Sequence, residues 1–333
     1  MSDNWGPLCP LPGDQFFLYK GTDGSIFYCN PGQPDAPMHL LVPSPYPSNY
    51  RVEVCVAVDV LGTQGVDGAP TVSSDWPYEH CFFPPAFRLA VCRYARRTGS
   101  IEIWEIRAEV EGGAIGYSSR LLKSFYDNVR PTCCSFLGDH VAYHSSSASA
   151  TRIVDWTAVI DEGPVLGVNI ALSSPFSSLL LPHRRILVHS SYIYIADWKS
   201  CNPSEASPTS RISPQWQSTE EFCQPHPYSV PFYIDSSIRL ILYRLQSPAL
   251  TGVIISTDPD VAVSDTVVLA QLADKQRAHL LCYKRPGDSL PEPSFSEIAF
   301  PEDTYTIYVD KARARSRVVM FIYKRPCKTT FFG

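Results

Sequence analysis

The sequence is poor in charge and contains no long apolar run. Charged residues make up 18% of the 333 positions, and 28 basic against 33 acidic residues give a net charge of -5. Such a balance offers no broad basic surface for nucleic acid. No stretch approaches the roughly 18 apolar residues that a membrane-spanning helix needs. Both shortages argue against nucleic acid and membrane as partners.

Secretion features are also missing. The start, Met1 to Gln15, has no basic segment followed by an apolar one. The eleven cysteines are an odd number, include no C-x-x-C pair, and occur without an accepted N-glycosylation site. This combination favours reduced, mostly buried thiols and a cytoplasmic or nuclear location.

The commonest catalytic signatures are absent. No P-loop, G-x-G-x-x-G, G-x-S-x-G or H-E-x-x-H pattern occurs. His140 and His144 are four positions apart, but their segment is typical of a strand, in which that spacing is roughly 13 Å and too wide for one ion. We therefore expect no catalytic residue, no metal site and no cofactor.

Proline and glycine, by contrast, are frequent at 30 and 18 residues, and they leave few windows in which a long helix could form. The one helix expected is Ser264–Ala278, whose β-branched first half also fits a strand. Between the interruptions lie short segments rich in Val, Ile, Tyr, Phe and Trp, which favour strands. Clear hairpins are predicted over Gln15–Asn30 and over Phe87–Ile106, the second with Gly99 supplying a positive φ at its turn.

Further antiparallel pairs are predicted along the rest of the chain. They are "GDHVAYHSS" with "ATRIVDW", "RRILVHS" with "YIYIADW", "VPFYID" with "IRLILYRL", "AHLLCYKR" with "SEIAF", and "TYTIYVD" with "RVVMFIYKR". A strand is also expected within Tyr50–Gly62. All of these pairs are local in sequence, which is typical of up-and-down antiparallel sheets.

An aromatic residue recurs near strand ends at a nearly regular interval, and its last two positions lie in a repeated Tyr-Lys-Arg-Pro. The positions are Trp104, Trp156, Trp198, Tyr243, Tyr283 and Tyr323. An earlier module is expected near Ser25–Asn30. The interval is that of a four-stranded propeller blade, so we predict one all-β domain over residues 1–333, a β-propeller-like array of about six to seven antiparallel blades with few or no long helices. A two-domain β-sandwich is the structural alternative.

Two long inserted loops are predicted, Gly62–Pro85 and Lys199–Pro227. Long loops without secondary structure are often functional. Trp76, Tyr78 and Trp216 lie in these loops, and Trp and Tyr are enriched at interface hot spots. They are the candidate partner-binding residues, with the alternative that each tryptophan only pins its loop to the body.

Basic residues gather at two hairpin turns. Arg313 and Arg315 alternate with small residues and would share one side of an extended segment, where they could contact an acidic partner. The alternative is a solvated turn whose charge opposes edge-to-edge association. Arg93, Arg96 and Arg97 are interpreted in the same way, as solvated charge at a turn.

Three short motifs lie between Phe87 and Leu245: Gly138 to Ala142 as "GDHVA", Ile153 to Trp156 as "IVDW", and Leu181-Pro182 leading to Ile186-Leu187. With these motifs the stretch from Phe87 to Leu245 resembles the C-terminal region of fungal, mushroom-type F-box proteins. The resemblance implies a propeller-like region that recruits a target protein, while a helical F-box elsewhere binds a ubiquitin-ligase adaptor. The short segment before "FFLYK" does not match an F-box, so adaptor binding is not expected of this chain.

The sequence therefore favours a non-enzymatic protein–protein interaction scaffold with an unidentified protein partner. The alternative is an enzyme, or a carbohydrate- or small-molecule-binding propeller, with its site at the central channel. A chain without a retained function is the third possibility. A deep pocket with converging carboxylates would favour the enzyme, and an exposed apolar patch would favour the scaffold.

Overall fold

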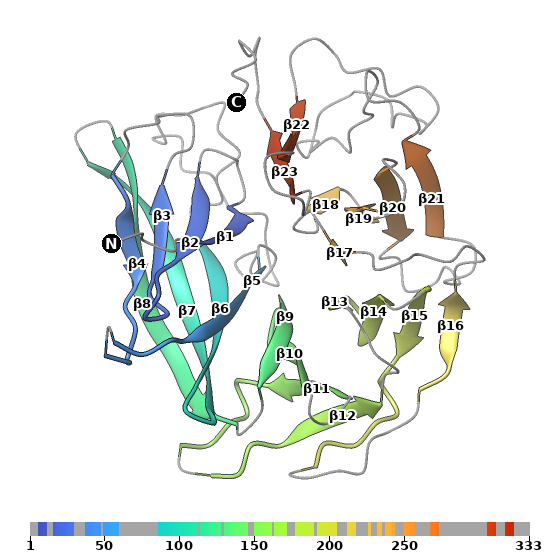
Figure 1. Ribbon diagram of the computed structural model, residues 1–333. Helices are drawn as coiled ribbons and strands as arrows, with labels where there is room; N and C mark the ends of the chain where they lie inside the picture. Colours follow the sequence, from blue (N-terminus) through green and yellow to red (C-terminus); the bar gives the residue numbers. More distant parts are fainter. Residues whose placement is uncertain are drawn as a thin grey trace. The chain divides into compact units, whose positions relative to one another are not determined.

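In a computed structural model of the protein (Figure 1), every regular element within the described residues is a strand. That part of the chain contains no helix long and apolar enough to cross a membrane. The structure describes residues 6–11, 16–29, 37–47, 49–59, 86–111, 114–127, 130–145, 150–161, 163–171, 177–189, 192–204, 212–217, 226–227, 232–234, 237–243, 250–256, 267–272, 305–310 and 317–322.

Consecutive strands form consecutive four-stranded sheets. The first contains β1 (Gly6–Pro10), β2 (Phe17–Lys20), β3 (Ile26–Cys29) and β4 (His39–Val42). The second contains β5 (Glu53–Asp59), β6 (Ala86–Ala95), β7 (Thr98–Glu111) and β8 (Ala114–Tyr126). The third contains β9 (Pro131–Leu137), β10 (His140–Ser145), β11 (Ala150–Asp155) and β12 (Gly167–Ala171). In each, spatial order follows chain order.

The later sheets follow the same plan. The fourth contains β13 (Ser177–Leu181), β14 (Arg185–His189), β15 (Ile193–Asp197) and β16 (Pro214–Gln217). The fifth contains β17 (His226–Pro227), β18 (Phe232–Ile234), β19 (Ser237–Tyr243), β20 (Leu250–Ser256) and β21 (Val267–Leu272), with β17 and β18 both paired to β19. The sixth contains β22 (Tyr305–Asp310) and β23 (Arg317–Ile322).

The chain divides into two compact units. Unit 1 consists of Met1–Val188 with Ala196–Pro214, and unit 2 consists of His189–Ile195 with Gln215–Gly333. The first three sheets belong to unit 1, and the fifth and sixth belong to unit 2. Unit 1 contains Cys55, Cys92 and Cys134 and the loop between β11 and β12.

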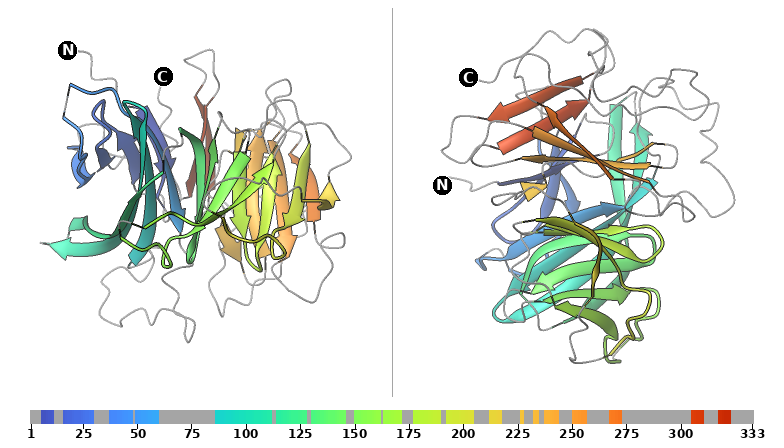
Figure 2. Two further views of the ribbon diagram at one scale, coloured as in Figure 1. Left: turned by 90° about the horizontal axis from the view of Figure 1, so that it is seen from below. Right: turned by 90° about the vertical axis from the view of Figure 1, so that its right-hand side faces the viewer.

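Within unit 1, neighbouring sheets pack face to face with their first strands together. Strand β5 contacts both β1 and β9, and β9 contacts β13. The fourth strands β4 and β8 also lie close, where Ser119 Oγ donates a hydrogen bond to Leu41 O. Figure 2 shows that β7 and β8 form a longer hairpin than the other strand pairs of the unit. First strands meeting first strands is the arrangement of propeller blades.

Strand β6 is buried on both of its faces. Phe87, Leu89 and Val91 pack with the first sheet, whereas Ala90 and Cys92 pack with the third. This alternation follows from the two-residue period of a strand. In keeping with this burial, β6 is mostly apolar apart from Arg88 and Arg93.

The predicted fold class is confirmed: the protein is an all-β, propeller-like array, and its six described sheets fit the predicted number of blades. The hairpins over Gln15–Asn30 and Phe87–Ile106 are present as β2–β3 and β6–β7. Pairing is also confirmed for β10–β11, β14–β15, β18–β19 and β22–β23. The pair "AHLLCYKR" with "SEIAF" and both Tyr-Lys-Arg-Pro stretches lie outside the described residues, and a single domain over the whole chain stays a prediction.

Two predictions of local structure are wrong. The helix Ser264–Ala278 is contradicted where the structure describes it, because Val267–Leu272 forms β21 and pairs antiparallel with β20. Adjacent β-branched residues at its start favour the strand. The positive φ of the β6–β7 turn belongs to Arg96 and Arg97, at 50° and 70°, and Gly99 is already paired in β7. Two consecutive positive φ values define the turn that suits a two-residue hairpin.

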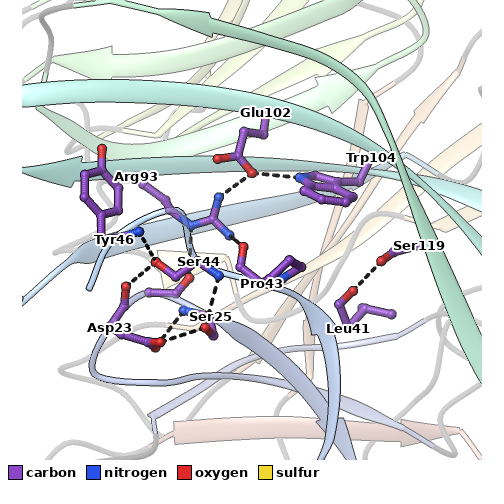
Figure 3. A network of polar contacts seen from close by, with 11 residues as sticks. Asp23, Ser25, Leu41, Pro43, Ser44, Tyr46, Arg93, Glu102, Trp104 and Ser119 are labelled. Atoms are coloured by element: carbon purple, nitrogen blue, oxygen red, sulfur yellow. Dashed lines mark hydrogen bonds and ion pairs between the residues drawn. The ribbon is translucent and has the colours of Figure 1, made fainter. Parts of the chain in front are cut away.

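Arg93 links the second sheet to the first (Figure 3). It lies on β6, is completely buried, and forms an ion pair with Glu102 on β7. Its Nε donates to Gly24 O at 3.0 Å, and its Nη2 donates to Pro43 O at 3.1 Å. Trp104 Nε1 donates to the same Glu102 carboxylate at 2.8 Å. The prediction that Arg93 is solvated turn charge is therefore wrong, because its side chain enters the boundary between two sheets.

The carbonyl groups that Arg93 contacts are themselves held in place. Ser25 donates from its backbone N and its Oγ to the Asp23 carboxylate, at 3.0 and 2.8 Å. Ser44 N donates to Ser25 Oγ at 3.1 Å, and Ser44 Oγ donates to Asp23 O at 2.5 Å (Figure 3). These bonds join the β2–β3 turn to the segment after β4, so both carbonyl groups reach Arg93 already oriented.

We expect Arg93→Met to lower the free energy of unfolding by about 3–5 kcal/mol, since it leaves the Glu102 carboxylate buried without its cation. The double change Arg93→Met with Glu102→Leu should recover part of this loss, because no uncompensated charge then remains. Urea denaturation followed by tryptophan fluorescence measures both.

Arg107→Met is the matched control, because Arg107 pairs with Glu105 on the exposed side of the same sheet. Exposed ion pairs contribute little to stability. Equal midpoints for Arg93→Met and Arg107→Met would contradict the proposed role of the buried pair.

Candidate functional site

The residues on which the resemblance to F-box proteins rests hold the turn between β9 and β10 in place. Gly138 and Asp139 form the turn between β9 and β10, and Gly138 has a φ of 56°. Trp156 follows β11 and donates from its backbone N to Asp139 O and from Nε1 to Gly138 O, both at 3.0 Å. Gly138 N donates to Asp59 Oδ2 of the second sheet at 2.8 Å. These motif residues have an architectural role.

The next sheet repeats the arrangement. Trp198 follows β15 and donates from its backbone N to Arg184 O at 2.9 Å, in the turn between β13 and β14. The Arg184 guanidinium lies over the Trp198 ring, 5.4 Å from its centroid, and Arg88 lies over Trp156 at 5.5 Å. In these two sheets the tryptophan after the third strand thus holds the turn between the first two strands, which accounts for the interval between Trp156 and Trp198.

The aromatic series does not keep its place in the fifth sheet. Trp104 is on β7, and Trp156 and Trp198 follow β11 and β15, so all three mark the third strand of a sheet. The predicted module near Ser25–Asn30 contains β3, again a third strand. Tyr243 instead ends β19, which precedes β20 in the sheet order. It is therefore not the structural counterpart of the tryptophans.

A second buried arginine organises the third sheet. Arg152 on β11 forms an ion pair with Asp127, Nε to Oδ2, at 3.0 Å. Its Nη1 donates to Asn169 Oδ1 at 3.2 Å, and its Nη2 donates to Val165 O at 2.5 Å. Tyr143 OH donates to the same Asp127 carboxylate. Like Arg93, this arginine combines an ion pair with hydrogen bonds to groups of the protein.

The two histidines considered for metal binding have separate surroundings on β10. The His140 ring meets the edge of Trp198, with ring centroids 5.1 Å apart. His144 is buried, and its Nδ1 lies 3.4 Å from Thr151 Oγ1. Burial lowers the pKa of both imidazoles. Each ring is thus engaged locally.

Three cysteines meet at the boundary between the second and third sheets. Cys55 on β5 and Cys92 on β6 are directly opposite each other, and Cys134 comes from β9. Their Sγ atoms all lie within 4.8 Å of one another. Hydrogen bonds with Cys134 and Cys55 lower the pKa of the Cys92 thiol to about 5. Hydrogen bonds with Cys55 and Cys92 raise the pKa of the Cys134 thiol. Thiol groups at this spacing could hold a soft metal ion.

Sequence reasoning missed this thiol cluster, which we define as Cys55, Cys92 and Cys134. The three cysteines are far apart in the chain, and their separations match no metal-ligand pattern. The available signal was topological, because β5 and β9 are first strands of neighbouring sheets and such strands lie together in a propeller. The three cysteines can be placed together only when the boundaries between the blades are known.

Two open grooves lie on unit 1. One, of about 500 Å³, is lined by Lys20, Tyr50 and Arg51 among others and contains no carboxylate. The other, of about 320 Å³, contains Glu105 with Arg107 and Arg120 at ion-pair distances of 3.0 Å. Neither groove brings together the two carboxylates that glycoside hydrolysis requires.

The loop between β11 and β12 presents apolar side chains to solvent. Ile160 is 74% exposed and Leu166 is 51% exposed, while their chain neighbours Val159 and Val165 pack against the core. Local anchoring of this kind makes a loop a defined surface feature. The sequence alone does not reveal this loop as a surface feature, because it does not distinguish exposed from buried aliphatic residues.

Most of the predicted partner-binding residues lie outside the described residues, namely Trp76, Tyr78, Arg313 and Arg315, together with the whole Gly62–Pro85 loop. Trp216 lies on strand β16 and is half-buried. The predicted loop Lys199–Pro227 thus includes a strand of the fourth sheet, so Trp216 is carried by the sheet edge.

Gly138 should be replaceable by Asn more easily than by Ala. No heavy atom lies within 4 Å of a Cβ added at Gly138, so the positive φ is the only obstacle. We expect Gly138→Ala to cost about 1–2 kcal/mol of stability and Gly138→Asn clearly less, because Asn tolerates the left-handed region. Thermal denaturation of both variants measures the difference.

Gly116→Ala is the control, since a Cβ there meets Tyr28 OH at an ordinary 3.5 Å and no positive φ is required. It should leave the melting temperature nearly unchanged. Equal losses for Gly138→Ala and Gly138→Asn would show that φ is not the reason for this glycine.

Comparison with known proteins gives low similarities. No protein-family model matches the chain, and no curated protein matches it significantly. Among solved structures, the WD40 domain of SCAP from fission yeast is 10% identical over 93% of this chain and 65% of that one, with a TM-score of 0.40. The fission yeast complex of SREBP and SCAP binding domains is 11% identical over 100% of this chain and 81% of that one, with a TM-score of 0.35. Hsv2 of Kluyveromyces lactis is 8% identical over 80% of this chain and 98% of that one, with a TM-score of 0.27. The chain spans less than two thirds of the length of the SCAP domain. The fold is assigned from the order of the strands in the sheets of this chain.

Proposed function

We propose that this chain is a non-enzymatic scaffold that binds another protein through the loop between β11 and β12. The observation that carries the proposal is the exposure of Ile160 and Leu166, at 74% and 51%, on a loop whose valines, Val159 and Val165, pack against the core. Contiguous exposed apolar surface marks interaction sites, and Ile160 and Leu166 are proposed to contribute to one such surface.

Polar contacts fix the loop at its start, middle and end. Asp155 Oδ1 accepts hydrogen bonds from Thr157 N and Oγ1 at 3.0 and 2.6 Å. Asp161 forms an ion pair with Lys123 of β8 at 2.5 Å, and Val165 O accepts the hydrogen bond from Arg152. A loop fixed in this way loses little conformational entropy when a partner binds, and such preorganisation raises affinity.

The chemistry of the loop suggests the chemistry of the partner. Next to Ile160 lies Asp161, whose side chain is 85% exposed even with Lys123 beside it. Exposed apolar side chains on a loop that also carries an exposed carboxylate suit a partner segment with apolar side chains flanked by Lys or Arg, because complementary charge favours the correct register. No observation on the described residues favours the enzyme or sugar-binding alternative.

We further infer a relationship to the target-recruiting region of fungal F-box proteins. Its support is that Gly138, Asp139 and Trp156 of the shared motif hold one another in a turn, so the motif marks a common way of building a blade. Trp76, Tyr78, Trp216, Arg313 and Arg315 stay predicted partner contacts, and a cytoplasmic or nuclear location stays a prediction.

The test is affinity purification with mass spectrometry from cells of the native organism, comparing the wild type with Ile160→Ser and Leu166→Ser. We expect recovery of a specific partner to fall at least about 10-fold in each variant, as for a residue near the centre of an interface. The purified partner is then titrated against both proteins by calorimetry to confirm a direct effect.

Leu40→Ser is the matched control, because Leu40 is an equally exposed leucine, at 54%, on β4. Trp216→Ala and Trp76→Ala form a second arm that tests the residues predicted from sequence. Partner recovery unaffected by Ile160→Ser and Leu166→Ser, with both variants folded, would refute binding through this loop.

A further inference from the structure

The thiol cluster is a feature that protein binding does not use. It lies at the boundary of the second and third sheets, within the apolar core that contains Phe136, Val141 and Val154. We propose that Cys55, Cys92 and Cys134 form a three-coordinate site for one thiophilic d¹⁰ ion, copper(I). This inference is independent of the proposed scaffold function, and neither result depends on the other.

The spacing of the three sulfur atoms suits one ion. With a metal–sulfur bond of about 2.3 Å, three sulfurs around a trigonal ion lie roughly 4 Å apart. The Sγ atoms here are already within 4.8 Å of one another. Binding therefore requires the sulfurs to close by less than about 1 Å, which side-chain rotation can provide without breaking the β5–β6 ladder.

The number of ligands selects the ion. Structural zinc almost always takes four protein ligands. The group found among the described residues has three members and no histidine or carboxylate. Cys133 is adjacent to Cys134 but is not a member of the group, because consecutive strand residues point to opposite faces. Its thiol interacts electrostatically with Cys55 and forms hydrogen bonds with Ser178 and His144. Copper(I) is soft, prefers thiolates, and is satisfied by three of them.

The surroundings suit copper in its reduced state. Cys92 is fully buried, and Phe125 and Tyr143 belong to the same apolar cluster. An apolar shell excludes water and oxidants and disfavours the divalent ion, which prefers harder ligands. Cys55 and Cys134 are only half-buried, so these two ligands lie nearer the surface than Cys92.

The three ligands come from two sheets, so the ion would join them. Cys55 and Cys92 belong to the second sheet and Cys134 to the third. An ion that binds the folded site and not the unfolded chain stabilises the protein. A metal-dependent rise in melting temperature is therefore a readout of the site itself.

The experiment titrates anaerobic, fully reduced full-length protein with copper(I) in competition with the chromophoric chelator bicinchoninate. We expect the wild type to withdraw one more equivalent of copper(I) than Cys92→Ser or Cys134→Ser. For each variant, affinity at this site should fall by at least the roughly 100-fold that loss of an outer-shell partner can cost. X-ray absorption should show a copper shell made only of sulfur.

Cys133→Ser is the matched control, because it removes the neighbouring thiol of the same strand and should retain the copper(I) equivalent. If a cluster variant does not fold, maleimide labelling of the wild type replaces it: copper(I) should protect the half-buried Cys55 and Cys134 and leave the half-buried Cys201 reactive. Equal copper(I) binding by wild type and folded cluster variants, or failure to protect Cys55 and Cys134, would overturn the proposal. Tighter binding of zinc(II) than of copper(I) would overturn the choice of ion.

Discussion

A buried guanidinium needs a complete set of partners, and the first two sheets are arranged around that need. Arg93 has no contact with water, so its charge must be balanced by Glu102 and its remaining donors must find carbonyl oxygens. Those oxygens belong to Gly24 and Pro43, on two different segments of the first sheet. The turn, the strand end and the ion pair therefore have to form together. Arg152 meets the same requirement in the third sheet, with Asp127 as its anion.

The sequence predicts what is local and periodic. Hairpins follow from alternating β-branched and aromatic residues, and the blade interval follows from tryptophans that hold a turn of their own sheet. The errors are also physical in origin. In the sequence Arg93 is one more arginine of the same short segment as Arg96 and Arg97, and packing of the first sheet on β6 is what buries Arg93 while the two turn arginines stay exposed. The hairpin turn accepts arginine at positive φ, where steric preference alone favours glycine.

The candidate sites depend on tertiary structure to different degrees. The thiol cluster needs three strands of two sheets, and no spacing rule contains that information. The exposed loop needs knowledge of which aliphatic residues the core leaves out, which a sequence does not carry. The buried charges Arg93, Glu102 and Arg152 are engaged in contacts within and between sheets. The proposed chemistry therefore rests on the thiol cluster, and the proposed recognition rests on Ile160 and Leu166.

The tryptophan contacts have a consequence for how such a chain can grow. Trp156 reaches back to Asp139, and Trp198 reaches back to Arg184, so each bond closes within its own sheet. Short closures of this kind cost little chain entropy and can form early in folding. When the gene segment that encodes such a sheet is duplicated, the copy contains both the turn and the tryptophan that holds it. Tandem duplication followed by divergence could thus lengthen the array while leaving the existing turns intact.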